Sequence, residues 1–586
     1  MPSAALPSSV QPPTVTWAAA GAVTPAALRA MPCPNCGAAD PKTHMLTVDV
    51  QLPDNPPKRL RLLRCPACTC RFYDDQVPPD YAEPALNDRG RVPFYVQQGA
   101  GVSLITRPLA MALAPPGSTY MEVGCGYGFG LDFACNTRGW RGRGIDPAPL
   151  AALGRDALGL PIELRYLRDD GEAQGTMDVV MGSEVIEHIP APYSFIALLR
   201  RWMQPGATLV LTTPNADTLT PGQDPANLVC MLSVGAHVIL YSARAIEVLL
   251  RRSGFAHIHT EAAGDTLVAF ASDQPLRFDA NAPARHLAGY RAYLQHLVAT
   301  AEPGRPLWNG AAGRLFELQC IDAPDLDALA LWDRIALAWR ERFGIDLLRR
   351  RMPAPVREQE FGRDAMALLQ AHAATQPFNL GAVLAARAVL ERRLPGHTPD
   401  TVLSYARPAF SICVQARRVL EEAGLIDLAL RNSAMQARML MLDSLAELAP
   451  EVELELLAAF ATGSGGALAG RIDVPPGQML PRIAHPFIRA VEDGRKEEAA
   501  RLAPALQDLD AVAAAPHSDP ITIVRLFQAI GMVRLHLHDP TGARAAFVQM
   551  AAQAAGWNAH PDWAAQAGPL LALANVHISH MDGLAQ

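Results

Sequence analysis

Several features that would assign this 586-residue sequence to a simple class are missing from it. No apolar run reaches about 18 residues, so the sequence predicts no transmembrane helix. The first residues lack a basic stretch followed by a compact apolar core, so we expect no signal peptide. The net charge of −7 provides no broad basic surface, so nucleic acid is not an expected partner. Ten cysteines in so long a chain indicate metal binding in a reducing compartment rather than a disulfide scaffold, and we expect a cytoplasmic protein.

Enough apolar sequence is present for several folded domains, because hydrophobic residues make up 50% of the chain. Composition and patterning change along the sequence and predict six segments. We expect a disordered tail over 1–30, a zinc ribbon over 31–76, a helical linker over 77–115, an α/β domain over 116–275, a helical connector over 276–355 and an all-α domain over 356–586.

The α/β domain is predicted from alternation. Short β-rich runs, namely "TYMEV", "GRGID", "MDVVMG", "TLVLTT", "HIHTEAA" and "DTLVAFAS", are separated by helical stretches such as "YSFIALLRRWMQ" and "SARAIEVLLRRSG". This pattern favours a mostly parallel sheet. In the all-α region, "AVEDGRKEEAARLAPAL" and "LHLHDPTGARAAFVQMAAQ" each place a polar turn before an Ala-rich helix. They resemble the second helix of tetratricopeptide-like repeats, and an irregular helical bundle explains them equally well.

Four cysteines form a zinc-ribbon pattern. Cys33 and Cys36 make one C-x₂-C pair, Cys65 and Cys68 make a second, and 28 residues lie between the two pairs. Four thiolates fill the coordination sphere of zinc, so the predicted site is structural. Cys70 is a spare. The basic run around the second pair could contact phosphate or form a solvated face; it comprises Lys58, Arg59, Arg61, Arg64 and Arg71.

A glycine-rich turn follows the first predicted strand in "TYMEVGCGYGFG". Gly124, Gly126 and Gly128 allow close approach of a ligand, but neither G-x-G-x-x-G nor a phosphate-binding Gly-Lys-Ser/Thr loop is present. Glu122 would repel phosphate and suits a cationic group. Asp146, at the end of the second strand, suits ribose hydroxyls. S-adenosylmethionine carries both groups and is the cofactor we expect.

These motifs resemble class I S-adenosylmethionine-dependent methyltransferases. "MEVGCGYGFG", "GIDP", "MDVVMGSEVIEHIPAP", "LRRWMQPGATLVLTTPN" and "HVILYSARAIEVLLRRSGF" occur in family order over roughly 160 residues. The resemblance implies a seven-stranded Rossmann-like sheet with one antiparallel strand near its edge, and an acidic residue near the adenine. A zinc ribbon ahead of the domain resembles bacterial sugar and natural-product methyltransferases. The implied cofactor-binding residues are Glu122, Gly124, Cys125, Gly126, Gly128, Asp146, Asp169, Asp170 and Ser183, where Cys125 is most simply a packing residue.

The segment "SEVIEHIPAP" follows the fourth predicted strand and carries the candidate catalytic residues Glu184, Glu187 and His188. Three interpretations remain open. The side chains shape the pocket, His188 acts as a general base, or the three groups hold a divalent cation such as Mg²⁺. E-x-x-E-H resembles the metal-binding segment of ubiquinone-pathway O-methyltransferases and of small-RNA 2′-O-methyltransferases. The latter add a later histidine, for which this chain offers His237.

From these features we expect a methyltransferase that modifies an oxygen, or less readily a carbon or nitrogen, of a saccharide-type or other small acceptor. Two alternatives remain. One is a metal-assisted RNA 2′-O-methyltransferase, and the other is a cofactor-binding scaffold that works through its helical C-terminal region, where a protein partner would bind.

Overall fold

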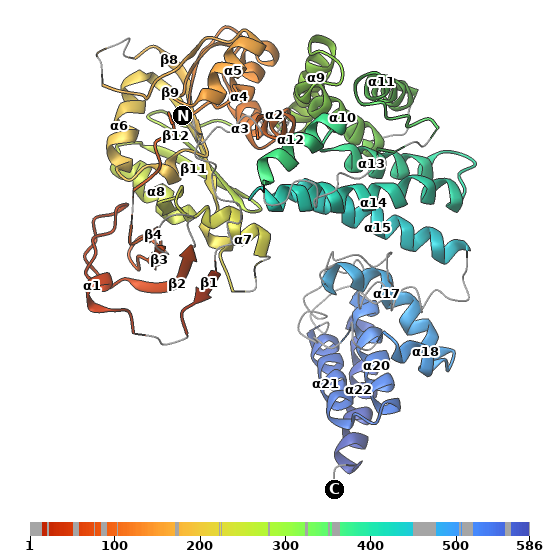
Figure 1. Cartoon of the computed structure of the whole chain (residues 1–586). Coiled ribbons are helices and arrows are strands. Elements are labelled where there is room, and N and C mark those ends of the chain that lie inside the picture. Colours follow the sequence, from red (N-terminus) through yellow and green to blue (C-terminus); the bar gives the residue numbers. More distant parts are fainter. Residues whose placement is uncertain are drawn as a thin grey trace. The chain divides into compact units, whose positions relative to one another are not determined.

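The structure is a computed structural model (Figure 1). It describes residues 14–19, 23–50, 58–75, 77–83, 91–101, 103–169, 171, 175–221, 223, 225–278, 282–322, 326–349, 352–353, 364–448, 476–502, 506, 520–556 and 564–584. The chain divides into two compact units. The first comprises Met1–Leu380 and Gln415–Leu428, and the second comprises Gly381–Val414 and Ala429–Gln586. The expected boundary near residue 355 therefore lies closer to residue 380.

The first sheet of unit 1 contains five antiparallel strands in the order β1-β2-β3-β4-β10. Four of them come from the predicted zinc-ribbon region and its approach, and the fifth comes from far along the chain. Their bounds are Thr14–Trp17, Thr43–Val50, Lys58–Arg64, Arg71–Tyr73 and Ile239–Leu240. The expectation of a disordered tail over 1–30 is wrong for β1 and for the short helix α1 (Ala26–Arg29), because β1 pairs with β2 along its whole length.

The second sheet has seven strands in the order β11-β12-β9-β8-β5-β6-β7. In chain order they are β5 (Thr119–Val123), β6 (Arg141–Ile145), β7 (Ile162–Glu163), β8 (Met177–Ser183), β9 (Met203–Pro214), β11 (His257–Ala263) and β12 (Thr266–Ser272). Strands β5 to β9 pair in parallel, and β12 runs antiparallel between β9 and β11. The predicted seven-stranded sheet with one antiparallel strand near its edge is confirmed.

Strand β8 shows why the central strands can be predicted from the sequence. Its residues are almost all buried, because β5 and β9 flank it and helices cover its faces. Such a strand is a continuous apolar run. Strand β7 has only two residues, so it carries no such run, and the sequence did not predict it.

The helices between residues 92 and 252 connect and cover these strands. Helix α8 is a clear case, since Ser242 caps it by accepting a hydrogen bond from the N–H of Ala245 at 3.0 Å. Its apolar face packs with α6 against the sheet. The remaining bounds are α2 (Val92–Gly99), α3 (Ser103–Met111), α4 (Phe129–Asp132), the π-helical turn η2 (Phe133–Thr137), α5 (Pro149–Leu158), η3 (Ile186–His188), α6 (Pro192–Trp202), η4 (Ala216–Thr218), α7 (Pro225–Leu232) and α8 (Ala243–Arg252).

Among the described residues, unit 1 also contains the helices α9 (Ala282–Thr300), α10 (Pro306–Asp322), α11 (Leu326–Phe343) and α12 (Ala365–Thr375). Asn309 joins two of them, since its Oδ1 accepts from the indole N–H of Trp339 at 2.9 Å and both side chains are buried. Helix α10 also packs on α2, so the predicted linker and connector form one body with the sheet.

Unit 2 is entirely helical among its described residues, as expected. Two hairpins place a polar turn before an Ala-rich helix, the first between α17 and α18 and the second between α20 and α21. The helices that lie wholly or mainly in this unit are α13 (Leu380–Arg393), α14 (Pro399–Glu422), α15 (Leu428–Leu448), α17 (Pro476–Glu492), α18 (Lys496–Ala500), α20 (Pro520–His536), α21 (Pro540–Gly556) and α22 (Ala564–Leu584). Among the described helices of both units, none combines the length and apolar character needed to cross a bilayer.

Candidate functional site

The glycine turn after β5 adopts the backbone conformation that its sequence predicts. Gly124, Gly126 and Gly128 have φ values of +70°, +52° and +92°, which residues other than glycine rarely adopt. The N–H of Gly124 donates to the carbonyl of Ile145 at 2.8 Å, so the turn is fastened to the end of the neighbouring strand β6. The loop is therefore held open for a ligand at the carboxyl edge of the sheet.

Asp146 fixes the second half of this loop. Its Oδ2 accepts from the N–H of Gly126 at 2.7 Å, and its Oδ1 accepts from the N–H of Ala148 at 2.7 Å. Burial raises the pKa of its carboxyl, while the two N–H donors oppose the rise. Each oxygen retains a second lone pair, so Asp146 can still accept hydrogen bonds from a ligand's hydroxyls.

Glu122 lies at the end of β5 and is only 1% exposed. Burial raises the pKa of its carboxyl to about 8, and the nearby charge of Asp146 acts in the same direction. Among the described residues, its Oε2 has no hydrogen-bond partner. A buried acceptor without a donor is costly, so this carboxylate is suited to a cationic ligand group.

The segment after β8 lies directly beside the glycine loop. Gly124 has no space for a Cβ atom because the side chain of Val185 occupies that position. Glu184 adopts a φ of +53°, which is unusual for a residue with a side chain. Thr212 supports this strained residue, since its Oγ1 donates to Glu184 Oε1 at 2.9 Å and lies 2.7 Å from the hydroxyl of Ser183.

Three side chains converge at the far end of this segment. Oε1 of the fully buried Glu187 lies 3.8 Å from Nε2 of His188 and 3.9 Å from Nε2 of His237. One potential ligand atom from each of these residues lies within 4.8 Å of the others. We call this set the Glu-His-His cluster. Glu184 is outside it, and the later histidine considered from the sequence is inside it.

The hydrogen bonds around the Glu-His-His cluster orient both imidazoles. Nδ1 of His188 lies 3.0 Å from the carbonyl of Ala236, and Nδ1 of His237 lies 2.8 Å from the carbonyl of Met231. A carbonyl can only accept, so each Nδ1 carries the proton and each Nε2 presents a lone pair toward Glu187. This is the arrangement in which protein histidines bind metals.

Burial makes the charged states within the Glu-His-His cluster unfavourable. It lowers the pKa of His188 and brings that of His237 to about 3. Burial also raises the pKa of Glu187 well above its usual value, and the charge of Glu184 adds to the rise. Oε1 of Glu187 has no hydrogen-bond donor among the described residues. Two neutral imidazoles and an unsatisfied carboxyl oxygen suit a bound cation.

Two other side chains that complete this site were missed by the sequence analysis. The hydroxyl of Tyr81 lies 2.7 Å from Nδ1 of His188, and Oγ1 of Thr213 donates to Glu187 Oε2 at 3.0 Å. Thr213 belongs to "LTTPN" at the end of β9, so its strand-end position was a usable signal. Tyr81 lies in a segment without any motif.

Of the two predicted adenine-side acids, Asp169 forms an ion pair with Arg201 in the last turn of α6. Asp170 lies outside the described residues. Cys125 is buried, and its sulfur fills the space beside Gly144 in which a Cβ would otherwise lie. Its packing role is consistent with the geometry.

The four predicted cysteine ligands meet at one point. The sulfurs of Cys33 and Cys68 are 3.6 Å apart, as are those of Cys36 and Cys65, and all four lie within 4.8 Å of one another. All four side chains are buried. Such a compact tetrad of thiols matches the ligand set of a closed tetrahedral metal site. Cys70 lies outside this set, although it is also buried.

The cysteine tetrad is built into the same hydrophobic core as the seven-stranded sheet. The amide of Asn35 donates to the carbonyl of Ala245 on α8 at 2.9 Å, and the hydroxyl of Thr69 lies 2.6 Å from that of Ser242. Strand β10 begins two residues after His237 and pairs with β4. The ribbon region therefore packs against α8 and pairs with the strand that follows His237 (Figure 1).

Comparisons with known proteins agree with this geometry. Residues 101–260 match the family model described as "Methyltransferase domain". Ubiquinone biosynthesis O-methyltransferases from Pseudomonas paraeruginosa and Hahella chejuensis are 35% and 36% identical over 106 and 110 residues, each match covering 17% of this chain and 45% of the relative. The chain thus spans a little under half the length of these curated relatives.

Among solved structures, a SAM-dependent methyltransferase from Aquifex aeolicus is 19% identical, with a TM-score of 0.22, and the match covers 32% of this chain and 94% of that one. The strand order, the glycine loop and the family match point to the same conclusion. Residues 101–260 match a methyltransferase domain, and the sheet that they share with β12 has the class I S-adenosylmethionine-dependent methyltransferase fold.

Proposed function

We propose that the chain transfers a methyl group from S-adenosylmethionine to an oxygen of a small-molecule or saccharide-type acceptor. The observation that carries this proposal is the Glu-His-His cluster, two of whose residues, Glu187 and His188, lie on the segment that touches the glycine loop. The donor's methyl group and the acceptor would meet at the carboxyl edge of the sheet. The relatives described as O-methyltransferases support oxygen as the methylated atom.

The chain's own residues would position the donor. The buried carboxylate of Glu122 would receive the amino group of the methionine moiety, and Asp146 would accept from the ribose hydroxyls. The positive-φ glycines would leave the backbone free to approach the donor. Alignment of acceptor oxygen, methyl carbon and sulfur accounts for much of the rate of such a transfer, so these contacts are the main contribution of the loop.

We also propose that Glu187, His188 and His237 hold a divalent transition metal. Two imidazoles and one carboxylate fit manganese, iron, cobalt or zinc better than the Mg²⁺ expected from the sequence, which prefers oxygen ligands. A metal bound here would lower the pKa of an acceptor hydroxyl. The carbonyls of Ala236 and Met231 would keep both imidazoles in the metal-binding tautomer.

A second metal is proposed at the cysteine tetrad, where Zn²⁺ would have a structural role. The four buried sulfurs leave no ligand position for a substrate. Because the tetrad shares its core with α6 and α8, zinc at this point would stabilise the wall that carries His237.

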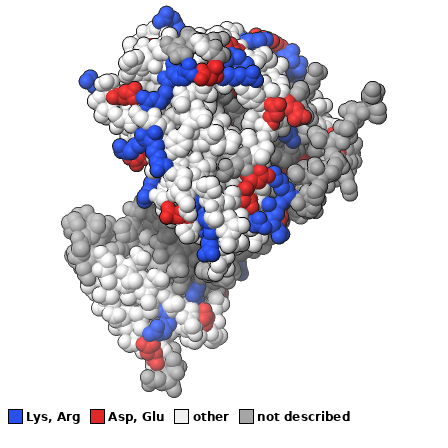
Figure 2. Space-filling model, turned by 90° about the vertical axis from the view of Figure 1, so that its left-hand side faces the viewer, with Lys and Arg blue, Asp and Glu red and all other residues white. Residues whose placement is uncertain are grey.

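Metal-assisted RNA 2′-O-methylation is the second candidate, favoured by the inclusion of His237 in the cluster. The charges argue against it. Four cations of the basic run are occupied in ion pairs, namely Lys58 with Asp75, Arg59 with Asp49, Arg61 with Asp74 and Arg71 with Asp217. Figure 2 shows basic and acidic side chains interspersed on the face in view, without a continuous basic surface. A phosphate backbone would find few free cations here.

Methyl transfer from radiolabelled S-adenosylmethionine to matched panels of sugars, phenols, amines and short RNAs tests the proposal. We expect hydroxyl acceptors to be labelled, with label in RNA only if the second candidate is right. Failure of the purified protein to bind S-adenosylmethionine in calorimetry would refute both candidates.

The metal hypothesis is tested with His237→Ala and a matched control, His257→Ala, at the start of β11 and away from the cluster. Elemental analysis should show loss of one metal ion from His237→Ala alone, with the cysteine-bound ion retained. Equal metal content in the two variants would contradict the metal hypothesis and would indicate that Glu187, His188 and His237 only shape the pocket.

A further inference from the structure

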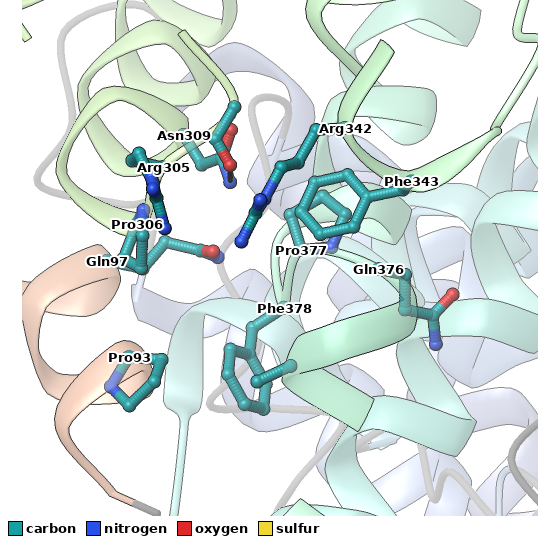
Figure 3. Close-up of a pocket in the computed structure, with 12 residues that line it drawn as sticks. Pro93, Gln97, Arg305, Pro306, Asn309, Arg342, Phe343, Gln376, Pro377 and Phe378 are labelled. Atoms are coloured by element: carbon teal, nitrogen blue, oxygen red, sulfur yellow. Dashed lines mark hydrogen bonds between the residues drawn. The ribbon is translucent and has the colours of Figure 1, made fainter. Parts of the chain in front are cut away.

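A separate cavity of about 150 Å³ lies between α2, α10, α11 and the end of α12 in unit 1. Figure 3 shows its lining as sticks. The lining residues are Pro93, Gln97, Gly304, Arg305, Pro306, Asn309, Arg342, Phe343, Ala373, Gln376, Pro377 and Phe378. A cavity of roughly this size admits a molecule as large as benzene, so its capacity is that of a small organic ligand.

Two arginines dominate the charge of this cavity, because none of the twelve lining residues is acidic. Both guanidinium groups point toward the middle of the space in Figure 3. Nε of Arg305 donates to Glu302 at 3.1 Å, which leaves its terminal nitrogens for a ligand. The backbone of Gly304 (φ +79°) lies against the stem of Arg342, so this side chain is held by packing.

The walls are suited to an organic body rather than to a bare ion. Phe343, Phe378 and three prolines supply apolar surface, and Phe378 is buried. Gln376 lines the cavity but is 1% exposed, and its side chain is turned away from the space in Figure 3, with its amide nitrogen 3.3 Å from Nδ1 of His372. A ligand that fills the space would thus meet two cationic groups and apolar walls.

Helix α10 adds to the attraction for an anion. It is 17 residues long and begins at Pro306, next to Arg305, so its amino end opens at the cavity. Helix amino termini favour negative charge. The side-chain amide of Asn309 donates to the carbonyl of Gly304 and accepts from the indole N–H of Trp339. Asn309 therefore shapes the wall of the cavity and is not expected to bind the ligand.

We propose that this cavity binds a small organic anion, a carboxylate or a phosphate ester with a compact apolar body. The anionic group would lie between Arg305 and Arg342, and the apolar body would lie against Phe343 and Phe378. The site is separate from the methyl-transfer site, because the cavity is lined by one face of α2 and an adjacent face of that helix packs against Tyr127 and Phe129, at the end of the glycine loop.

Calorimetric titration of the full chain with phenyl phosphate, benzoate, inorganic phosphate and neutral benzyl alcohol tests the inference. We expect one of the two organic anions to bind more tightly than the other three probes, and its identity distinguishes a phosphate ester from a carboxylate. Arg342→Gln and Arg305→Gln should each weaken that binding by about tenfold or more, since each removes charge-assisted hydrogen bonds.

Arg340→Gln is the matched control, because Arg340 lies on the same helix but outside the cavity lining. It should bind the anion as the unaltered chain does. All three arginines are exposed, so the variants should fold, and melting curves check this. The inference is overturned if neither organic anion binds with millimolar affinity, if benzyl alcohol binds equally well, or if Arg342→Gln leaves the affinity unchanged.

Discussion

Replacement of Glu122 by glutamine should raise the free energy of unfolding and weaken the binding of S-adenosylmethionine. Burial raises the pKa of this carboxyl from 4.5 to about 8. Between these values the folded chain binds a proton that the unfolded chain releases, so stability falls as the pH rises through this window. At 1.36 kcal/mol per pKa unit, the full cost of ionising Glu122 above pH 8 is about 5 kcal/mol, and at pH 7 it is about 3 kcal/mol. Glutamine resembles the protonated acid and avoids this cost.

The affinity for S-adenosylmethionine should rise with pH over the range in which the stability of the fold decreases. A cationic amino group requires the carboxylate form of Glu122, so below its pKa the free protein must lose a proton to bind S-adenosylmethionine. The affinity should therefore rise about tenfold per pH unit between roughly pH 6 and 7 and level off near 8. In Glu122→Gln the affinity should be low at every pH and lack this slope.

Denaturant titrations at several pH values, followed by tryptophan fluorescence, measure the first effect, and calorimetry measures the second. Trp140 and Trp202 are buried in the same unit as Glu122, so the signal reports on the relevant transition. Glu247→Gln, on the exposed side of α8, is the control and should change neither quantity. The reasoning is refuted if Glu122→Gln is destabilised above pH 8, or if it binds the cofactor as tightly as the unaltered chain.

Four other substitutions test the packing. Cys36→Ser should remove the cysteine-bound ion and lower the melting temperature of unit 1, since the tetrad lies in the sheet's core; elemental analysis and calorimetric melting check this. Gly310→Ala should lower the free energy of unfolding by about 1–3 kcal/mol, because a Cβ there would overlap the carbonyl of Gln97. Gly289 on α9 has room for a Cβ, so Gly289→Ala should raise the free energy of unfolding by about 0.5–1 kcal/mol, and denaturant titrations measure both values. Ser242→Ala should destabilise α8 by about 1 kcal/mol through loss of its cap, and unchanged stability would contradict that role.

The strands that sequence predicted correctly are those whose local pattern matches their surroundings. The runs around β5, β8 and β9 are apolar along their length because parallel strands at the centre of a sheet are buried on both faces. The glycine loop was predictable because only glycine suits its positive φ values. Among the cluster residues, Glu187 and His188 came from one short motif, and His237 was suggested only by resemblance to metal-dependent relatives.

What the sequence could not provide depends on contacts between distant segments. Strands β7 and β10 have two residues each, too few for a periodic pattern. Tyr81 reaches His188 from a stretch whose path is set by the ribbon, and Asp169 is drawn to Arg201 by a charge that no motif indicates. In each case tertiary packing, which local propensity does not encode, decides the position.

The pairing of β10 with β4 also has a kinetic consequence. Between these strands in the chain lie β5 to β9, so the five-stranded sheet closes only after a very long loop has been brought together. Contacts of such high sequence separation form late, because the chain entropy they cost is recovered only once the intervening elements have condensed. His237 lies two residues before β10, so the Glu-His-His cluster should be among the last parts of unit 1 to assemble during folding. The glycine loop would then be complete before the Glu-His-His cluster is.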